Sequence, residues 1–352
     1  MKYLRFLLYS SSLIFCFILG IGVGLNKWFP FQPLQVLNKT IKNKLSKNLS
    51  NDELLFELAK TNNIEIPHDI EGINLKSPLI KSDPMRFISY GDNQSKKMNS
   101  LMDSINKQNV SLVVHLGDTE SSPSLCTNSY INLQRDFMSS LDTPVLFTPG
   151  DNDWLDCSDK TKGEFYNLER LANIRETFFS KNKNFGNKSS IFENQSVRGY
   201  PENARIIKKN VAFISAHVVG GNNNFDPFRK KNTLEYLNRD QANIDWITES
   251  FETYKEATAY VVAIHANIFK NKKIPFLYEK FAYALFELSN KYKKPVLLLH
   301  GDIHNFKAYQ PMKSKYPFLH VIQNFGYPDL KALEIEVNPS KKIPFNVIKI
   351  IE

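Results

Sequence analysis

The feature that most constrains this chain is an apolar run that ends in an aspartate or a histidine, and that occurs five times. These runs cover residues 86–92, 111–118, 144–151, 260–265 and 295–304. Short runs rich in Val, Leu, Ile and Phe predict buried strands. Because the carboxyl ends of strands in α/β sheets open into ligand crevices, the pattern predicts a site at which these polar side chains meet.

Strand-like and helical segments alternate from Met85 to the end of the chain, which predicts a layered α/β domain with some antiparallel pairing near the C-terminus. With 352 residues, 42% of them hydrophobic, the chain is long enough to bury one large core. The expected helices cover residues 96–108, 130–141, 162–181, 234–254 and 275–292. Further strands are expected over residues 211–219, 318–324, 332–337 and 344–350.

The N-terminus has the pattern of a membrane segment. Lys2 and Arg5 precede an uncharged and mostly apolar run over residues 6–25, which is about the length that crosses a bilayer as a helix. No clear cleavage site follows, so we predict an uncleaved signal anchor over residues 1–26 in preference to the cleaved signal of a secreted protein. A basic linker with stalk helices is expected over residues 27–84, and a folded domain over residues 85–352.

The side of the membrane on which this domain lies depends on two opposing signals. Lysines beyond the apolar run argue weakly for a cytoplasmic location. Cys126 and Cys157 argue against it, because each follows an Asp-bearing strand end and the fold would bring their loops together. A disulfide there requires an oxidising compartment. We therefore predict an extracytoplasmic domain, with two unpaired thiols as the alternative.

The net charge of +9 raises the alternative of a basic protein that binds nucleic acid, whose binding would be sensitive to salt and independent of metal. The general richness in Lys, Asn and Ile accounts for the charge more simply. The first fifty residues carry seven basic side chains and no acidic one. Nucleic acid is therefore not the expected partner.

Four ionised carboxylates in one crevice repel one another, so either some hold a proton or a cation balances them. Two histidines would add nitrogen donors. Ordinary Gly-Asp turn chemistry explains any one of these positions but not the ordered set. Two metal ions are the usual machinery for phosphate-ester hydrolysis, so the set predicts a dinuclear site. The six candidate ligands are Asp92, Asp118, Asp151, His265, Asp302 and His304.

In this order the residues resemble the blocks of the calcineurin-like metallophosphoesterase superfamily, which run D-x-H, G-D-x-x, G-N-H-D/E, H and G-H-x-H. The resemblance covers the chain from about Met85 onward. It implies a two-sheet β sandwich flanked by helices, with a dinuclear metal centre at the strand ends. It also implies that Asp118 bridges the two metal ions while a bound hydroxide attacks phosphorus.

The sequence departs from that pattern at three blocks. Asn93-Gln94 leaves the first block without its histidine, Asp151-Asn152 replaces the Asn-His pair of the third, and Asp302 replaces the first histidine of the last. These features resemble a branch of the superfamily that carries Gly-Asp-Asn-Glu-Trp and His-Gly-Asp-Ser-His. A shell richer in oxygen favours Mn, Mg or Fe over zinc.

An amide cannot act as a general acid, so Asn152 is expected to orient the phosphate and the leaving group must find its proton elsewhere. We predict that His217 lies near the substrate as that acid, with a buried structural histidine as the alternative. Asn222, Asn223 and Asn224 are candidates for substrate hydrogen bonds, or for a turn. The chain as a whole is predicted to be a membrane-anchored phosphatase or phosphodiesterase; the alternative is a non-catalytic envelope protein that keeps the fold for binding.

Overall fold

The computed structural model describes residues 84–92, 97–119, 124–180, 185–186, 190, 192–269 and 273–352. All of them belong to one compact unit, Ile64–Glu352. The predicted anchor over residues 1–26 and nearly all of the predicted linker lie outside the described residues. Within the described part of the chain, no helix is long and apolar enough to cross a membrane.

A five-stranded sheet carries three of the five motif runs. Its order is β12-β11-β1-β2-β3. The strands β1 (Met85–Tyr90), β2 (Val113–His115) and β3 (Val145–Phe147) are parallel, and their register places Tyr90 beside His115 and His115 beside Phe147. The three strands therefore end level at one edge. The strands β11 (Ala332–Val337) and β12 (Phe345–Ile351) pair antiparallel, which confirms the expected antiparallel pairing near the C-terminus.

The other two motif runs lie in a seven-stranded sheet of order β4-β5-β6-β7-β8-β10-β9. Its parallel centre consists of β6, β7, β8 and β10, whereas β4, β5 and β9 pair antiparallel at the two sides. The bounds are β4 Glu193–Gln195, β5 Tyr200–Lys208, β6 Val211–Ser215, β7 Ala259–Ala263, β8 Val296–His300, β9 Lys307–Tyr309 and β10 Leu319–Gln323.

Successive residues of a strand point to opposite faces of its sheet, and in the central strands both faces are apolar. One apolar face of each sheet packs against the other sheet. Phe87 of β1 faces the seven-stranded sheet and contacts Phe213 of β6, with ring centroids 5.1 Å apart. The next residue, Ile88, points the other way into a second core beneath the helices. Period-two alternation thus fills two cores from one strand.

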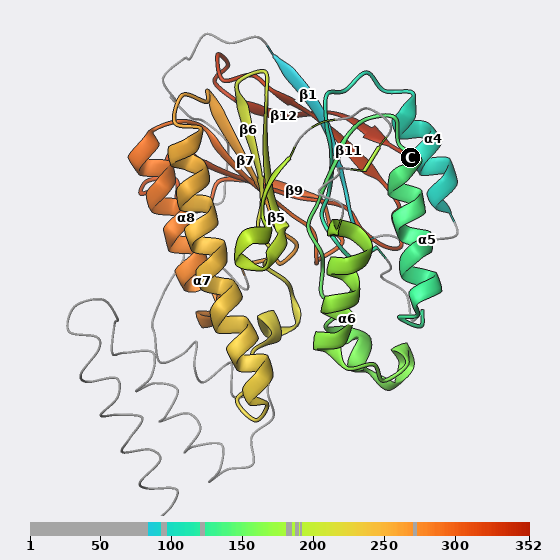
Figure 1. The fold of residues 1–352 in the computed structure, drawn as a ribbon. Helices are drawn as coiled ribbons and strands as arrows, with labels where there is room; N and C mark the ends of the chain where they lie inside the picture. The colour runs from blue at the N-terminus through green and yellow to red at the C-terminus, as the bar shows by residue number, and fades with distance from the viewer. Residues whose placement is uncertain are drawn as a thin grey trace, which may run out of the picture. The chain divides into compact units, whose positions relative to one another are not determined.

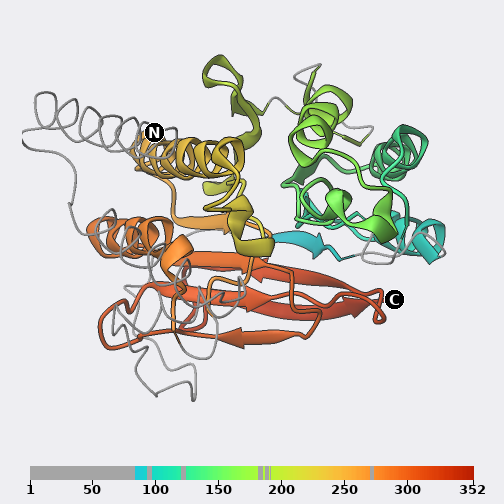
Figure 2. The same cartoon turned by 90° about the horizontal axis from the view of Figure 1, so that it is seen from below.

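Helices cover both outer faces and complete a mixed α/β fold (Figures 1 and 2). Helices α4, α5 and α6 pack on the five-stranded sheet through the second core. Helices α7 and α8 pack against each other and on the seven-stranded sheet, where Phe251 stacks on Tyr260 at 4.0 Å. The bounds are α4 Met98–Asn106, α5 Asn128–Ser139, α6 Asn167–Ile174 with a π turn Arg175–Phe179, α7 Lys230–Thr253 and α8 Glu279–Tyr292.

Several elements differ from the sequence prediction, which does not include the short strands β4 and β9. The helix expected from residue 162 begins at Asn167, because Gly163 adopts a left-handed φ of 104° and closes a separate 3-10 turn, Lys160–Lys162. The strand expected over 211–219 ends at Ser215. Strand β5 was not predicted, because its run Tyr200–Lys208 begins with proline and polar residues that hide the pattern of a buried strand.

Candidate metal centre

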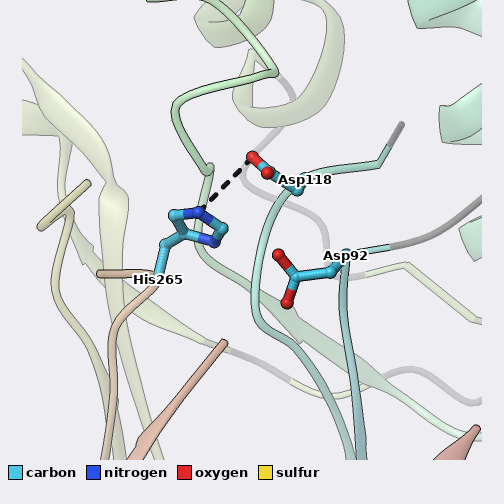
Figure 3. A group of neighbouring side chains, drawn as sticks. All are labelled: Asp92, Asp118 and His265. Carbon is cyan, nitrogen blue, oxygen red and sulfur yellow. Dashed lines mark ion pairs between the residues drawn. The ribbon is translucent and has the colours of Figure 1, made fainter. Parts of the chain in front are cut away.

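The six candidate ligands all lie just beyond the carboxyl ends of strands, and they come from both sheets. Figure 3 shows Asp92 and Asp118 on neighbouring segments, with His265 facing them from the opposite side. Three follow β1, β2 and β3, and three follow β7 and β8: Asp92, Asp118 and Asp151, and His265, Asp302 and His304. Each sheet therefore supplies half of the set.

Their donor atoms approach one another closely. Asp92, Asp118 and His265 form one group, and Asp151, His265 and Asp302 form another, with the donor atoms of each group within 4.8 Å of one another. The Nε2 atom of His265 lies 3.0 Å from Oδ1 of Asp151 and 3.5 Å from Oδ1 of Asp118. The structure therefore brings the predicted carboxylates and His265 together at one site.

His304 joins this site on the side of Asp92, with its Nε2 3.4 Å from the Asp92 Oδ1. In both histidines Nδ1 lies against a backbone carbonyl, that of Leu116 for His265 at 2.8 Å and that of Tyr327 for His304 at 2.7 Å. An Nδ1–H that donates to a carbonyl leaves the Nε2 lone pair directed at the carboxylates. This is the arrangement in which histidine binds a metal ion.

Unusual backbone conformations aim the ligands into the site. Asp92, Asp118, Asp302 and His304 have φ values of 52°, 50°, 74° and 62°, in the left-handed region that few non-glycine residues adopt. Each costs about 1 kcal/mol. Hydrogen bonds fix the first of them, because the Asp92 N–H donates to the Gly117 carbonyl at 3.0 Å. Such strain gathers at functional sites.

Glycines let the backbone approach the carboxylates. A Cβ at Gly150 would lie 2.1 Å from Oδ1 of Asp118, and one at Gly220 would lie 2.4 Å from Oδ2 of Asp151. Neither position has room for a side chain, so glycine is required there by the close approach of the carboxylates. The loops after β3 and β6 thus wrap directly against the ligand oxygens.

The electrostatics are those of an anionic cluster in which the carboxylates outnumber the histidines. Burial raises the pKa of Asp118 well above its usual range, and the neighbouring carboxylates add to the shift while His265 opposes it. Burial alone would lower the pKa of His265, but Asp118 and Asp151 raise it well above its usual range. Protons thus balance the buried charge. Divalent cations would balance it with the same oxygen and nitrogen donors, so this donor set fits a metal centre.

The carboxylate of Asp153 holds two of the loops that carry the candidate ligands. It accepts hydrogen bonds from the backbone N–H groups of Gly150 at 2.7 Å and Asp118 at 3.0 Å, and from both the N–H and the hydroxyl of Thr119. It therefore ties the loop after β2 to the loop after β3. Sequence reasoning gave this residue no role, and its only signal was its place in the turn that also holds Asp151.

Asn152, which the sequence analysis expects to orient the phosphate, lies beside the carboxylate of Asp118. Its Nδ2 donates to Oδ2 of Asp118 at 2.6 Å, and its backbone N–H donates to Oδ1 of Asp118 at 2.9 Å. On its other side, the Asn152 Oδ1 accepts a hydrogen bond from Nζ of Lys162. Lys162 is a second residue at this site that sequence reasoning missed.

His217 does not have a free ring nitrogen in this structure. Its ring is completely buried, its Nδ1 lies 2.9 Å from Oε1 of Glu202, and its Nε2 accepts a hydrogen bond from Nε1 of Trp154 at 3.2 Å. Both nitrogens are therefore used inside the protein. This placement corresponds to the alternative of a buried structural histidine and gives no support to the acid role.

Two of the three asparagines after β6 also face inward. Oδ1 of Asn223 accepts from Nη1 of the buried Arg239 at 2.8 Å, and Nδ2 of Asn224 donates to Oε2 of Glu235 at 2.7 Å. Their left-handed φ values of 53° and 63° belong to a turn. The turn alternative therefore describes Asn223 and Asn224, and Asn222, which is half-buried, remains the candidate for contact with substrate.

A disulfide joins Cys126 and Cys157, the pair that the sequence analysis considered, with an S–S distance of 2.01 Å. It connects the segment after β2 with the segment after β3. The Cys126 N–H also donates to the carbonyl of Lys162 at 3.1 Å. The disulfide therefore holds the backbone that places Lys162 beside Asn152.

The family model of the calcineurin-like phosphoesterases matches residues 67–306. No curated protein matches the chain. Among solved structures, a dimetal phosphatase from Danio rerio is similar at a TM-score of 0.47 and 11% identity, over 76% of this chain and 99% of that one. The protein TT1561 of Thermus thermophilus is similar at a TM-score of 0.40 and 8% identity, over 76% of this chain and 100% of that one.

Proposed function

The chain belongs to the calcineurin-like phosphoesterase family, and on that premise we propose that it is a metal-dependent hydrolase of phosphate esters. One observation carries the proposal. Three candidate ligands from each sheet meet at the strand ends, with Asp92 and His265 completely buried and Asp118 only 2% exposed. Buried carboxylates of this kind need a partner of opposite charge, and a metal centre supplies it.

We assign the ligands to two ions by their neighbours. Asp118 belongs to the first group of donor atoms, and its Oδ1 lies 3.5 Å from Nε2 of His265, the residue that both groups share, so we assign Asp118 to both ions. The first ion would also be held by Asp92 and His304, and the second by Asp151, His265 and Asp302. The prevalence of carboxylate oxygens favours Mn, Mg or Fe over zinc.

Two such ions would supply positive charge to the phosphate and activate a water as the nucleophile. The protein side chains would position the substrate around them. Asn152 points its amide at Asp118 and is placed to donate to a phosphoryl oxygen. Asn222 is a second candidate for such a contact, because its neighbour Gly221 approaches the Asp151 carboxylate.

We also propose that this domain works outside the cytoplasm, held by a membrane anchor over residues 1–26. The disulfide between Cys126 and Cys157 supports an oxidising compartment. The anchor rests on the sequence pattern of residues 6–25 alone.

The test is hydrolysis of p-nitrophenyl phosphate and of its bis-ester by the full chain, first stripped of metal and then supplied with Mn. We expect Mn-dependent turnover, and a loss of at least ~100-fold in kcat/KM for Asp118→Asn, because it removes the charge of the carboxylate that we assign to both ions. Asp103→Asn, the same change at an exposed position of α4, is the matched control and should leave turnover unchanged. A folded protein that binds Mn and hydrolyses neither ester would instead be the binding protein of the alternative.

A further inference from the structure

A lysine stands next to the uncharged residue at the centre of the site. Nζ of Lys162 donates to Oδ1 of Asn152, and the same amide donates through Nδ2 to the carboxylate of Asp118 at 2.6 Å. Ammonium, amide and carboxylate thus lie in a hydrogen-bonded row. The Lys162 side chain is half-buried, so its charge is placed beside the centre without being sealed from solvent.

Several contacts fix the backbone of this lysine. Lys162 donates its N–H to the carbonyl of Asp159 at 3.0 Å, and its carbonyl accepts from Cys126 at 3.1 Å. Cys126 is in turn held by the disulfide to Cys157. Immediately afterwards, Gly163 turns the chain with a left-handed φ of 104°. These contacts set the position of the Lys162 backbone, from which its side chain reaches the Asn152 amide.

The positive charge of Lys162 can offset the negative charge of the site. The centre gathers carboxylates, and a phosphate ester that approaches it is also an anion. Asn152 carries no charge, so it donates a hydrogen bond but does not offset the anionic surroundings. An ammonium group that gives one N–H to the Asn152 amide has two further donors, and it is a compact charge suited to phosphate.

We propose that Lys162 binds a phosphoryl oxygen of the substrate and that Asn152 directs its ammonium group toward the metal centre. The proposal rests on the proposed function and adds a substrate-binding residue to it. Asp156 and Asp159 lie close enough to Lys162 to interact with its charge. They weaken the attraction between Lys162 and a phosphoryl oxygen but do not abolish it.

The test measures binding of inorganic phosphate to the Mn-loaded full chain by calorimetry, so that it does not depend on turnover. We expect Lys162→Met to weaken phosphate binding about tenfold or more, the usual loss for a charge-assisted hydrogen bond. Lys162→Arg should retain part of the affinity. The control is Lys160→Met, which removes the same charge from an exposed position of the same 3-10 turn and should leave phosphate binding unchanged.

Calorimetry with Mn distinguishes substrate binding from a general structural effect, since Lys162→Met should bind Mn as wild type does. The inference is wrong if Lys162→Met and Lys160→Met bind phosphate equally well, if the variant loses Mn as well as phosphate, or if the wild-type chain binds no phosphate. Phosphate binding that depends on Lys162, in a chain that hydrolyses no ester, would uphold this inference and reject the proposed function.

Discussion

Residues that are far apart in the sequence support the loop after β3, which contains Asp151 and Trp154. Glu202 is completely buried, and Arg175 donates to it at 2.6 Å from Nη2 to Oε1. The ionised carboxylate holds the Nδ1–H of His217, which leaves Nε2 of that ring to accept from Trp154. Trp154 lies three residues after Asp151. The buried charge of Glu202 therefore fixes the His217 ring, and that ring in turn holds Trp154 in the loop after β3.

This arrangement predicts a pH-dependent loss of stability in Glu202→Gln. Burial would raise the pKa of Glu202, but Arg175 and His217 outweigh it and lower the pKa to about 2 from 4.5. A depressed pKa stabilises the fold above pH 4.5, and that stabilisation is lost as the pH falls toward 2. We expect Glu202→Gln to lower the free energy of unfolding by on the order of 3 kcal/mol at pH 7, measured by urea denaturation.

Repeating the urea titration between pH 4.5 and pH 2 checks the cause. The difference between Glu202→Gln and wild type should shrink through that window. Glu176→Gln, at an exposed position close by in the sequence, should behave as wild type at each pH. A difference that stays constant down to pH 2 would contradict an ionised Glu202 in the folded protein.

At the scale of elements, the site depends on how the loops after β2 and β3 pack together. A Cβ at Gly117 would lie 2.3 Å from the Gly150 nitrogen, so these loops touch through their backbones. The Asp153 carboxylate joins them by hydrogen bonds. Farther along the chain, the disulfide joins the same two segments covalently.

We expect the double variant Cys126→Ser and Cys157→Ser to lose about 2–4 kcal/mol in the free energy of unfolding, which is typical for a closed loop. Mn affinity should change little, because Asp153 still holds Asp118 and Gly150 in place. Calorimetry with Mn and urea denaturation measure the two effects. Cys16→Ser is the control, and equal stability of the double variant and wild type would contradict a structural role of the bond.

The strand ends and the polar side chains that follow them were predictable, because apolar runs and Gly-Asp turns are local signals. Strand β5 was not, since Glu202 and Asn203 are polar and yet buried. Their partners Arg175 and Asn243 lie 27 and 40 residues away. The sequence leaves both a substrate contact and a structural role open for His217 and Asn223 for the same reason, since local sequence does not show that Glu202 and Arg239 bind them. Periodicity predicts apolar burial, and it carries no signal for polar burial between distant residues.

At the scale of the whole molecule, the proposed metal centre lies where the two sheets meet. Asp118 and Asp151 come from the five-stranded sheet, and His265 and Asp302 from the seven-stranded one. A hydrogen bond also joins the two sheets directly, from the hydroxyl of Thr148, just after β3, to the carbonyl of Ala216, just after β6, at 3.2 Å. Ions bound by these residues would join the sheets, whereas without ions, bound protons must balance the buried carboxylates.

Metal should therefore stabilise the entire domain. At a Mn concentration about 100 times the dissociation constant, we expect about 2.7 kcal/mol of added stability, seen as a higher Tm by calorimetry and reversed by a chelator. Asp118→Asn should lose most of this increase, whereas Asp103→Asn should keep it. Bound Mn that leaves the Tm unchanged would contradict a centre shared by both sheets.

The order of the strands also sets when a newly made chain can become active. Strand β1, which carries Asp92, pairs with β11 from the far end of the sequence. Tyr327, just before β11, donates its N–H to the Asp92 carbonyl, and its own carbonyl receives Nδ1 of His304. The hydrogen bond from Asp92 to Gly117 needs only the first part of the domain, but a ribosome must finish nearly the whole chain before Asp92 has its contacts with β11 and Tyr327. A chain whose synthesis stops before residue 327, or that is truncated there, would therefore be inactive.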